Sequence, residues 1–98
     1  LSFGGRLPHR LDAKSLETFG ETFLGETINP GKPAFTAHPR VDPVRERLVG
    51  FSTSNMAVET DLYEYDKRFA QLGKTRSLRE VRGLVHDFAI TQSYCVFY

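Results

Sequence analysis

The chain has 98 residues, of which 40% are hydrophobic and 26% charged, a composition typical of one small globular domain. Thirteen Lys and Arg balance twelve Asp and Glu, so the net charge of +1 gives no field that would attract nucleic acid. Apolar runs are too short for a membrane-spanning helix, and no signal-peptide pattern is visible. The single Cys95 excludes an internal disulfide and is expected to be a small core residue.

Alternating apolar and polar residues, the period of a half-buried β-strand, recur along the chain between turn residues. The alternating segments follow one another in pairs: RLPHRLD with SLETFG, AFTAHPRVD with RLVGFSTS, DLYEYD with RFAQLG, and LREVRGLVHDFAIT with SYCVFY. Helical spacing occurs only in the ambiguous DAKSLETFGETFL, and the prolines of GETINPGKPAF indicate a loop. We therefore predict an all-β fold, an antiparallel meander, with sandwich, barrel and propeller all open.

An aspartate ends the first member of each of the three early pairs, and a glycine follows seven or eight residues later. These residues are Asp12 with Gly20, Asp42 with Gly50, and Asp66 with Gly73. Asp side chains accept hydrogen bonds from the backbone of a turn, and Gly adopts bends that other residues avoid. The spacing predicts an Asp-capped turn in each hairpin and a second bend at each glycine.

Two of the three histidines lie in apolar strand patterns. His38 is expected on a strand face, and the following Pro39 should end the ladder or force a bulge. His86 is expected to share a face with Leu84 and Phe88, where its ring nitrogens need a carbonyl, a carboxylate or a metal as partner. No close-set metal motif such as HxH or CxxC is present, so from these residues alone a structural histidine is the simpler interpretation.

Longer stretches around both histidines resemble one known family. The stretch FTAHPRVDPVRERLVGFSTS resembles the segment that carries the first iron ligand of the carotenoid cleavage oxygenases, the family that includes the retinal pigment epithelium isomerase. VHDFAITQSYCVF resembles the segment that carries the second ligand, and RLPHRLDAKSLETFG matches the hairpin that precedes the first. The three motifs occur in the family's order and spacing and cover nearly the whole chain.

The resemblance implies a seven-bladed β-propeller with Fe(II) on its axis, held by four histidines from inner strands. His38 and His86 match the first two of these ligands. The other two lie downstream in family members, so residues 1–98 are expected to form one to two blades of a longer enzyme. Two imidazoles supply half of the ligand set, and we expect this chain alone to bind Fe(II) weakly and to be inactive.

Family members use O2 to cut a carbon–carbon double bond in a polyene or stilbene, which gives two carbonyl products. The resemblance therefore implies that the full-length protein is a carotenoid or apocarotenoid cleavage dioxygenase, whose partners are O2 and a hydrophobic polyene. Imidazole ligands suit iron, and because they are neutral the site keeps a positive charge that helps retain the ferrous state. No nucleic-acid partner is expected, and peripheral membrane contact of the full-length protein stays open.

The resemblance also implies roles for residues beside the matched ligands. Phe88 is a candidate for lining the substrate tunnel, although packing within a blade explains it equally well. Asp87 points to the opposite face, which indicates a structural role in capping or hydrogen bonding. Many relatives carry a glutamate just before the stretch matched by GGRLPH, where this chain has Phe3 or Gly4, and such a carboxylate would orient a ligand histidine. His9 is expected to be a strand residue and not a ligand.

Two alternatives belong to other functional classes. One is a non-catalytic propeller that has lost ligands and serves as a binding module. The sequence after Tyr98 would decide this, because an enzyme needs two further histidines. The other is a small independent β-domain that binds a partner through the apolar edge of SYCVFY. A stilbene-cleaving oxygenase is the remaining variant of the enzyme hypothesis.

Overall fold

The computed structural model describes residues 6–54, 59–81 and 85–98, and within these ranges the chain forms strands and turns but no helix. The strands are β1 (His9–Leu11), β2 (Thr18–Glu21), β3 (Ala34–Phe35), β4 (Arg40–Asp42), β5 (Arg47–Thr53), β6 (Thr60–Asp66), β7 (Arg76–Leu78), β8 (Phe88–Ile90) and β9 (Cys95–Phe97). Every strand pair is antiparallel, which confirms the all-β prediction. The ambiguous DAKSLETFGETFL forms turns and β2. The described residues accordingly contain no helix that could cross a membrane.

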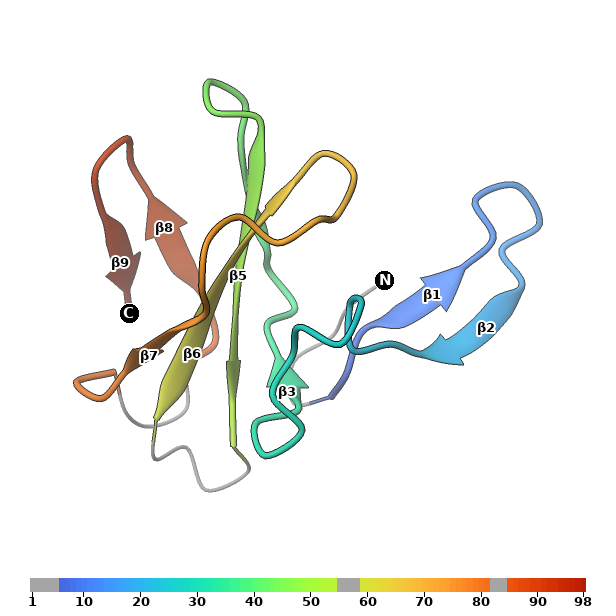
Figure 1. Ribbon diagram of the computed structural model, residues 1–98, viewed down its shortest axis with the longest axis horizontal. Helices are drawn as coiled ribbons and strands as arrows, with labels where there is room; N and C mark the ends of the chain where they lie inside the picture. The colour runs from blue at the N-terminus through green and yellow to red at the C-terminus, as the bar shows by residue number, and fades with distance from the viewer. Residues whose placement is uncertain (1–5, 55–58, 82–84) are drawn as a thin grey trace.

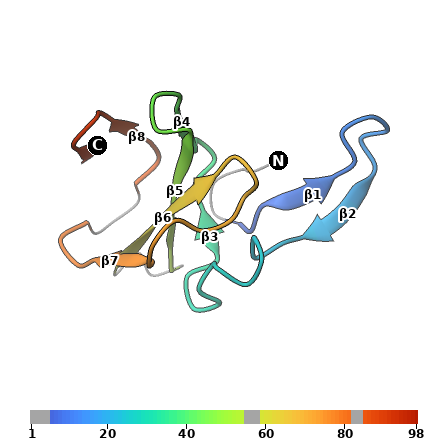
Figure 2. The same cartoon turned by 45° about the horizontal axis from the view of Figure 1, so that its top comes forward.

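The strands form three sheets (Figure 1). The central sheet has five strands in the order β3-β5-β6-β7, and β4 also pairs with β5. Its longest ladder joins β5 to β6, from Arg47 opposite Asp66 to Thr53 opposite Thr60. The β1–β2 hairpin extends from one side of this sheet and the β8–β9 hairpin lies at the other, an arrangement that Figure 2 shows again after a turn of 45°.

One predicted strand is wrong. The segment RFAQLG was expected to pair with DLYEYD, but residues 67–70 form the turn that follows β6. Only an isolated bridge between Tyr65 and Gln71 continues the pairing. The strand that pairs with β6 on the side away from β5 is β7, whose Arg76 lies opposite Leu62.

Alternation along β5 and β6 gives the central sheet two buried faces. Tyr63 and Tyr65 point to the first face, where their stacked rings have centroids 6.2 Å apart. The cluster on this face comprises Leu7, Ile28, Phe35, Tyr63 and Tyr65. The cluster on the second face comprises Val49, Phe51, Leu62 and Phe88. Because Phe88 belongs to β8, this second cluster joins the β8–β9 hairpin to the central sheet.

Aspartates cap three turns, as the Asp–Gly spacing predicts. The pairs of backbone N–H groups that donate to one carboxylate oxygen are Lys14 and Ser15 for Asp12, Val44 and Arg45 for Asp42, and Arg68 and Ala70 for Asp66. Gly20 and Gly73 have φ angles of +112° and +68°, in the region that favours glycine. The predicted bend at Gly73 is therefore confirmed, whereas Gly20 lies within β2, beside an irregularity in its pairing with β1.

Gly50 serves a different purpose, and the prediction of a bend there is wrong. It lies in the middle of β5, where a Cβ atom would come within 2.5 Å of Cζ of Phe35. The Phe35 ring is only 3% exposed and cannot easily move aside. Glycine is required at this position because the aromatic ring of β3 packs directly on the backbone of β5.

Gly50→Ala should destabilise the chain by about 1–3 kcal/mol, because the new methyl group overpacks the buried ring of Phe35. Urea unfolding followed by circular dichroism measures the loss. In a Phe35→Leu background the same change should cost less, since the ring that meets the methyl group is gone. An equal cost in both backgrounds would contradict the packing explanation.

The pKa of Asp42 lies below its ordinary value. The backbone N–H of Arg45 is the largest cause; burial acts in the opposite direction, and the Arg47 guanidinium, 3.0 Å away, lowers the pKa further. A carboxylate whose folded pKa is lowered adds stability above its unfolded pKa of about 3.9. This contribution is lost as the pH falls through the folded pKa.

Asp42→Asn should therefore lower the midpoint of urea unfolding at pH 7, and the difference from the unchanged chain should shrink towards pH 3. Glu46→Gln is the matched control, because the Glu46 side chain is exposed and its nearest Lys67 nitrogen is 3.9 Å away. A difference that stays constant between pH 7 and pH 3 would show that the Asp42 charge does not matter.

Candidate metal centre

His38 lies outside the strands, in the segment that separates β3 from β4. Both strands pair with β5, yet the four residues 36–39 between them face only residues 50–51. The two extra residues force the chain out of the ladder. Pro39 has no N–H to donate to the ladder, and Thr36 Oγ1 accepts the N–H of His38 at 3.1 Å. The predicted interruption is confirmed. The predicted position of His38 on a strand face is wrong, because the bulge exposes its imidazole.

His86 also lies outside the strands, two residues before the start of β8. The predicted face shared with Phe88 does not form, since His86 is exposed and Phe88 is buried. The third expected member of that face, Leu84, lies outside the described residues. The Asp87 carboxylate accepts the N–H of Phe88 at 2.8 Å, a local hydrogen bond that competes with strand pairing.

The structure brings the two imidazoles into direct contact although they are 48 residues apart in sequence. The Nε2 atoms of His38 and His86 are 3.2 Å apart, and the ring planes meet at 72°. Metal–imidazole bonds of about 2.0–2.1 Å, at angles of about 90–110°, place neighbouring ligand nitrogens about 2.8–3.4 Å apart. The pair therefore has the spacing of two neighbouring ligands of one metal ion, and its exposed rings leave room for such an ion.

An ion pair joins the two segments that carry the histidines. Nη2 of Arg40 donates to both carboxylate oxygens of Asp87 at 2.7 and 2.8 Å, and Nε donates to the carbonyl oxygen of Phe88 at 2.9 Å. The hydrogen-bonding role predicted for Asp87 is confirmed. Sequence analysis missed Arg40; the available signal was a basic residue two positions after His38, in the stretch HPR.

Burial alone would raise the pKa of Asp87. The N–H of Phe88 and the guanidinium of Arg40 outweigh burial, and together with the nearby His38 they hold the pKa below its ordinary value. The carboxylate is therefore charged at neutral pH and is engaged by Arg40. The Nε2 atoms of His38 and His86 face each other.

Comparison with known proteins decides the family. The family described as "Retinal pigment epithelial membrane protein" matches residues 3–98. The chain belongs to this family. The resemblance to carotenoid cleavage oxygenases found in the sequence is thereby confirmed.

Oxygenases are among the relatives of this member of the retinal pigment epithelial membrane protein family. Apocarotenoid-15,15'-oxygenase of Synechocystis sp. is 34% identical in an alignment 100 positions long. The alignment covers 95% of this chain and 20% of the relative. Resveratrol cleavage oxygenase 1 of Botryotinia fuckeliana is 30% identical over 94 residues, which cover 92% of this chain and 16% of the relative. The chain thus spans about a fifth or less of the length of these relatives.

The crystal structure of cobalt-substituted Synechocystis ACO is similar to this chain, with a TM-score of 0.79 and 35% sequence identity. The match covers 97% of this chain and 21% of that structure. Cobalt substitution indicates that this relative is a metalloprotein, which agrees with the metal-like spacing of the histidine pair.

Phe88 is fully enclosed in this family member, with an exposed fraction of 0%. Its ring lies at right angles to Phe51, with centroids 5.2 Å apart, and stacks on Phe97 at 5.4 Å. The half-buried Cys95 packs against the same cluster, as expected, and burial raises the pKa of its thiol. Phe88 therefore packs the core of this chain, and the role in lining a substrate tunnel stays a prediction.

Two further predictions concern His9 and the expected glutamate. His9 is part of β1, as predicted for a strand residue. Phe3 and Gly4, the positions of the expected glutamate, lie outside the described residues. Over residues 6–54, 59–81 and 85–98, no group of three or more His, Cys, Asp or Glu is placed to hold a metal ion by itself.

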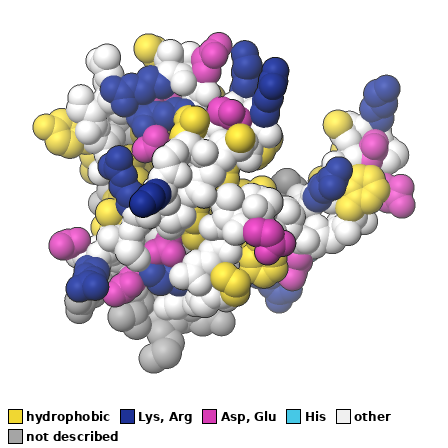
Figure 3. Space-filling model, viewed as in Figure 1, with side chains coloured by type: hydrophobic (Ala, Val, Ile, Leu, Met, Phe, Trp, Pro, Cys, Tyr) yellow, Lys and Arg dark blue, Asp and Glu magenta, His cyan; other side chains and the backbone are white. Residues whose placement is uncertain are grey.

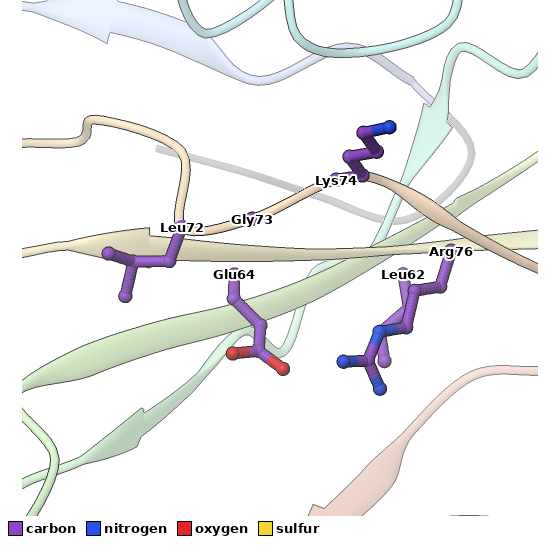
Figure 4. Close-up of a pocket in the computed structure, with 6 residues that line it drawn as sticks. All are labelled: Leu62, Glu64, Leu72, Gly73, Lys74 and Arg76. Atoms are coloured by element: carbon purple, nitrogen blue, oxygen red, sulfur yellow. The ribbon is translucent and has the colours of Figure 1, made fainter.

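A small cavity between β6 and β7 offers no second candidate site. Its volume is about 40 Å³, and its lining residues are Leu62, Glu64, Leu72, Gly73, Lys74 and Arg76 (Figure 4). The Glu64 and Arg76 side chains extend to the same side of the strands, whereas Lys74 points away. This space suits a water molecule but is far below the several hundred Å³ of an organic ligand site.

The surface charge follows the balanced composition. On the face drawn in Figure 3, Lys and Arg side chains are interspersed with Asp and Glu, and no extended surface of one sign forms there.

Phe88→Ala should destabilise the chain by about 3–5 kcal/mol, because it leaves a cavity between two aromatic rings. Urea unfolding measures the loss. Val96→Ala is the control on the same hairpin, since Val96 is 49% exposed and should change stability by no more than about 0.5 kcal/mol. A Phe88→Ala chain as stable as the control would show that Phe88 does not join the hairpin to the central sheet.

Proposed function

We propose that this chain is part of a non-haem Fe(II)-dependent dioxygenase that cleaves a carbon–carbon double bond in a carotenoid- or apocarotenoid-like polyene. The observation that carries the proposal is the 3.2 Å separation of the Nε2 atoms of His38 and His86. Membership of the family and the oxygenase relatives support it. The cobalt-substituted neighbour supports a divalent metal at the site.

In this proposal His38 and His86 hold Fe(II) through Nε2 and are two of four histidine ligands. The other two come from a part of the longer protein that this chain, about a fifth of its relatives' length, does not include. Coordination through Nε2 fixes the proton of each neutral imidazole on Nδ1. Arg40 engages the charged Asp87, so this carboxylate does not compete for the metal.

The β-strands of this chain are proposed to form one to two blades of a seven-bladed propeller. A TM-score of 0.79 to a chain about five times longer supports such a partial domain. Antiparallel neighbours connected by short turns are the building blocks of propeller blades. In a closed ring, the histidine-bearing segments before β4 and β8 would face the axis.

The proposed reaction balances without an external reductant. O2 and one carbon–carbon double bond give two carbonyl groups, so each oxygen atom enters one product and the cleaved bond supplies the electrons. Bound Fe(II) would supply the activation of O2. The residues of this chain contribute the orientation of two ligands, and the protein as a whole must align the scissile bond and exclude water.

A stilbene is the second candidate substrate class, favoured by the 30% identity to a resveratrol cleavage oxygenase. A stilbene and a polyene share a conjugated double bond, but a stilbene is short and carries an aromatic ring on each side. Assays of a full-length protein with an apocarotenoid and with resveratrol separate the two classes. Lack of product from both, with no iron retained, would favour a non-catalytic binding propeller.

In a full-length protein that contains this chain, His38→Ala and His86→Ala should each reduce iron content and product formation by more than about 100-fold, because a ligand is lost. Metal analysis of the purified protein and product chromatography measure both quantities. His9→Ala is the matched control and should change neither. Full iron content and turnover in the His86→Ala protein would refute the ligand assignment.

A further inference from the structure

Arg40 and Asp87 lie where two separately built parts of the fold meet. Arg40 belongs to β4 of the central sheet, and Asp87 precedes β8 of the separate β8–β9 sheet. No strand ladder among the described residues joins these two sheets. Their relative position therefore depends on contacts other than strand pairing, among them the aromatic packing around Phe88 and the ion pair between Arg40 and Asp87.

Aromatic packing alone does not fix the orientation of the β8–β9 hairpin as closely as two ligands of one metal ion require. Apolar contacts are non-directional, so by themselves they specify the orientation of the β8–β9 hairpin less sharply than directed hydrogen bonds do. The Arg40 guanidinium supplies such hydrogen bonds, because it donates to two carboxylate oxygens and to one backbone carbonyl. Three directed hydrogen bonds from one planar group fix both the distance and the orientation of the segment that they bind.

The histidines are attached to this ion pair by very short segments. His86 immediately precedes Asp87, and only Pro39, with its restricted φ, separates His38 from Arg40. We infer that Arg40 and Asp87 are positioning residues that hold the two imidazoles at ligand spacing before any metal binds. The metal-binding part of this inference rests on the proposed function, whereas the imidazole contact does not.

A purely stabilising ion pair is the competing explanation, and exposure argues against it. The Arg40 and Asp87 side chains are 39% and 24% exposed, and ion pairs so accessible to solvent add little to stability. Arg47, 11% exposed, bridges Asp42 and Glu64 away from the histidines. Arg47 is therefore the matched control, since its loss should affect stability more and the imidazole contact less.

The first test is nuclear magnetic resonance of the metal-free 98-residue chain. The unchanged chain and the Arg47→Lys variant should show a nuclear Overhauser effect between the rings of His38 and His86. Arg40→Ala should lose it, and so should Arg40→Lys, which keeps the charge but cannot donate to three oxygens in the same way. An unchanged effect in either Arg40 variant overturns the inference.

The second test is titration of the same chains with Co(II), followed by its visible absorption. Arg40→Ala and Asp87→Asn should weaken Co(II) binding by about 10–100-fold, whereas Arg47→Lys should not. Equal affinity in Arg40→Ala and the unchanged chain overturns the inference, provided that His86→Ala lowers the affinity. If His86→Ala has no effect, the proposed metal site fails, and the ring contact in the first test still decides the positioning role.

Discussion

The ladder between β5 and β6 is the interaction on which the rest of the molecule depends. Its seven residue pairs run through the centre of the chain, and both of its faces are covered. One face receives the loop segments around Leu7 and Ile28, and the other receives the β8–β9 hairpin. Neither the β1–β2 hairpin nor the β8–β9 hairpin forms a ladder with this sheet. The β8–β9 hairpin packs on the sheet through Phe88, and the segment before β1 is joined to it by the bridge between Arg6 and Phe35. The candidate metal centre depends on the same ladder, because His38 lies between two strands that pair with β5 and His86 lies just before β8, which packs on the sheet.

Hairpin positions and turn caps were predictable because their causes are local. An aspartate accepts N–H groups two to four residues further on, so the effects of Asp12, Asp42 and Asp66 are contained in a few adjacent positions. The alternation that places Tyr63 and Tyr65 on one face is equally local. The resemblance to family segments added the pair His38 and His86, which neither alternation nor spacing could have selected.

What could not be predicted depends on contacts between distant segments. Gly50 resembled a turn residue, and only the ring of Phe35 across the ladder explains it. His38 resembled a strand residue because the surplus of residues opposite β5 becomes visible only once the register is known. Arg40 and Asp87 are 47 residues apart, and no periodicity relates them. Such pairings are set by the packing of whole elements, on which a local pattern carries no information.

The register that β4 adopts after the surplus residues 36–39 decides which of its side chains reaches Asp87. Four residues stand opposite two, so the alternation of sides resumes unchanged in β4, with Arg40 towards β8 and Val41, which is 69% exposed, towards solvent. A shift of β4 by one residue against β5 would exchange these sides, since successive strand residues point in opposite directions. A valine would then meet the carboxylate of Asp87, and an arginine would point to water. Residues 36–39 lie outside the ladder and can absorb a change of length, so it is the pairing of β4 with β5 that keeps Arg40 at Asp87.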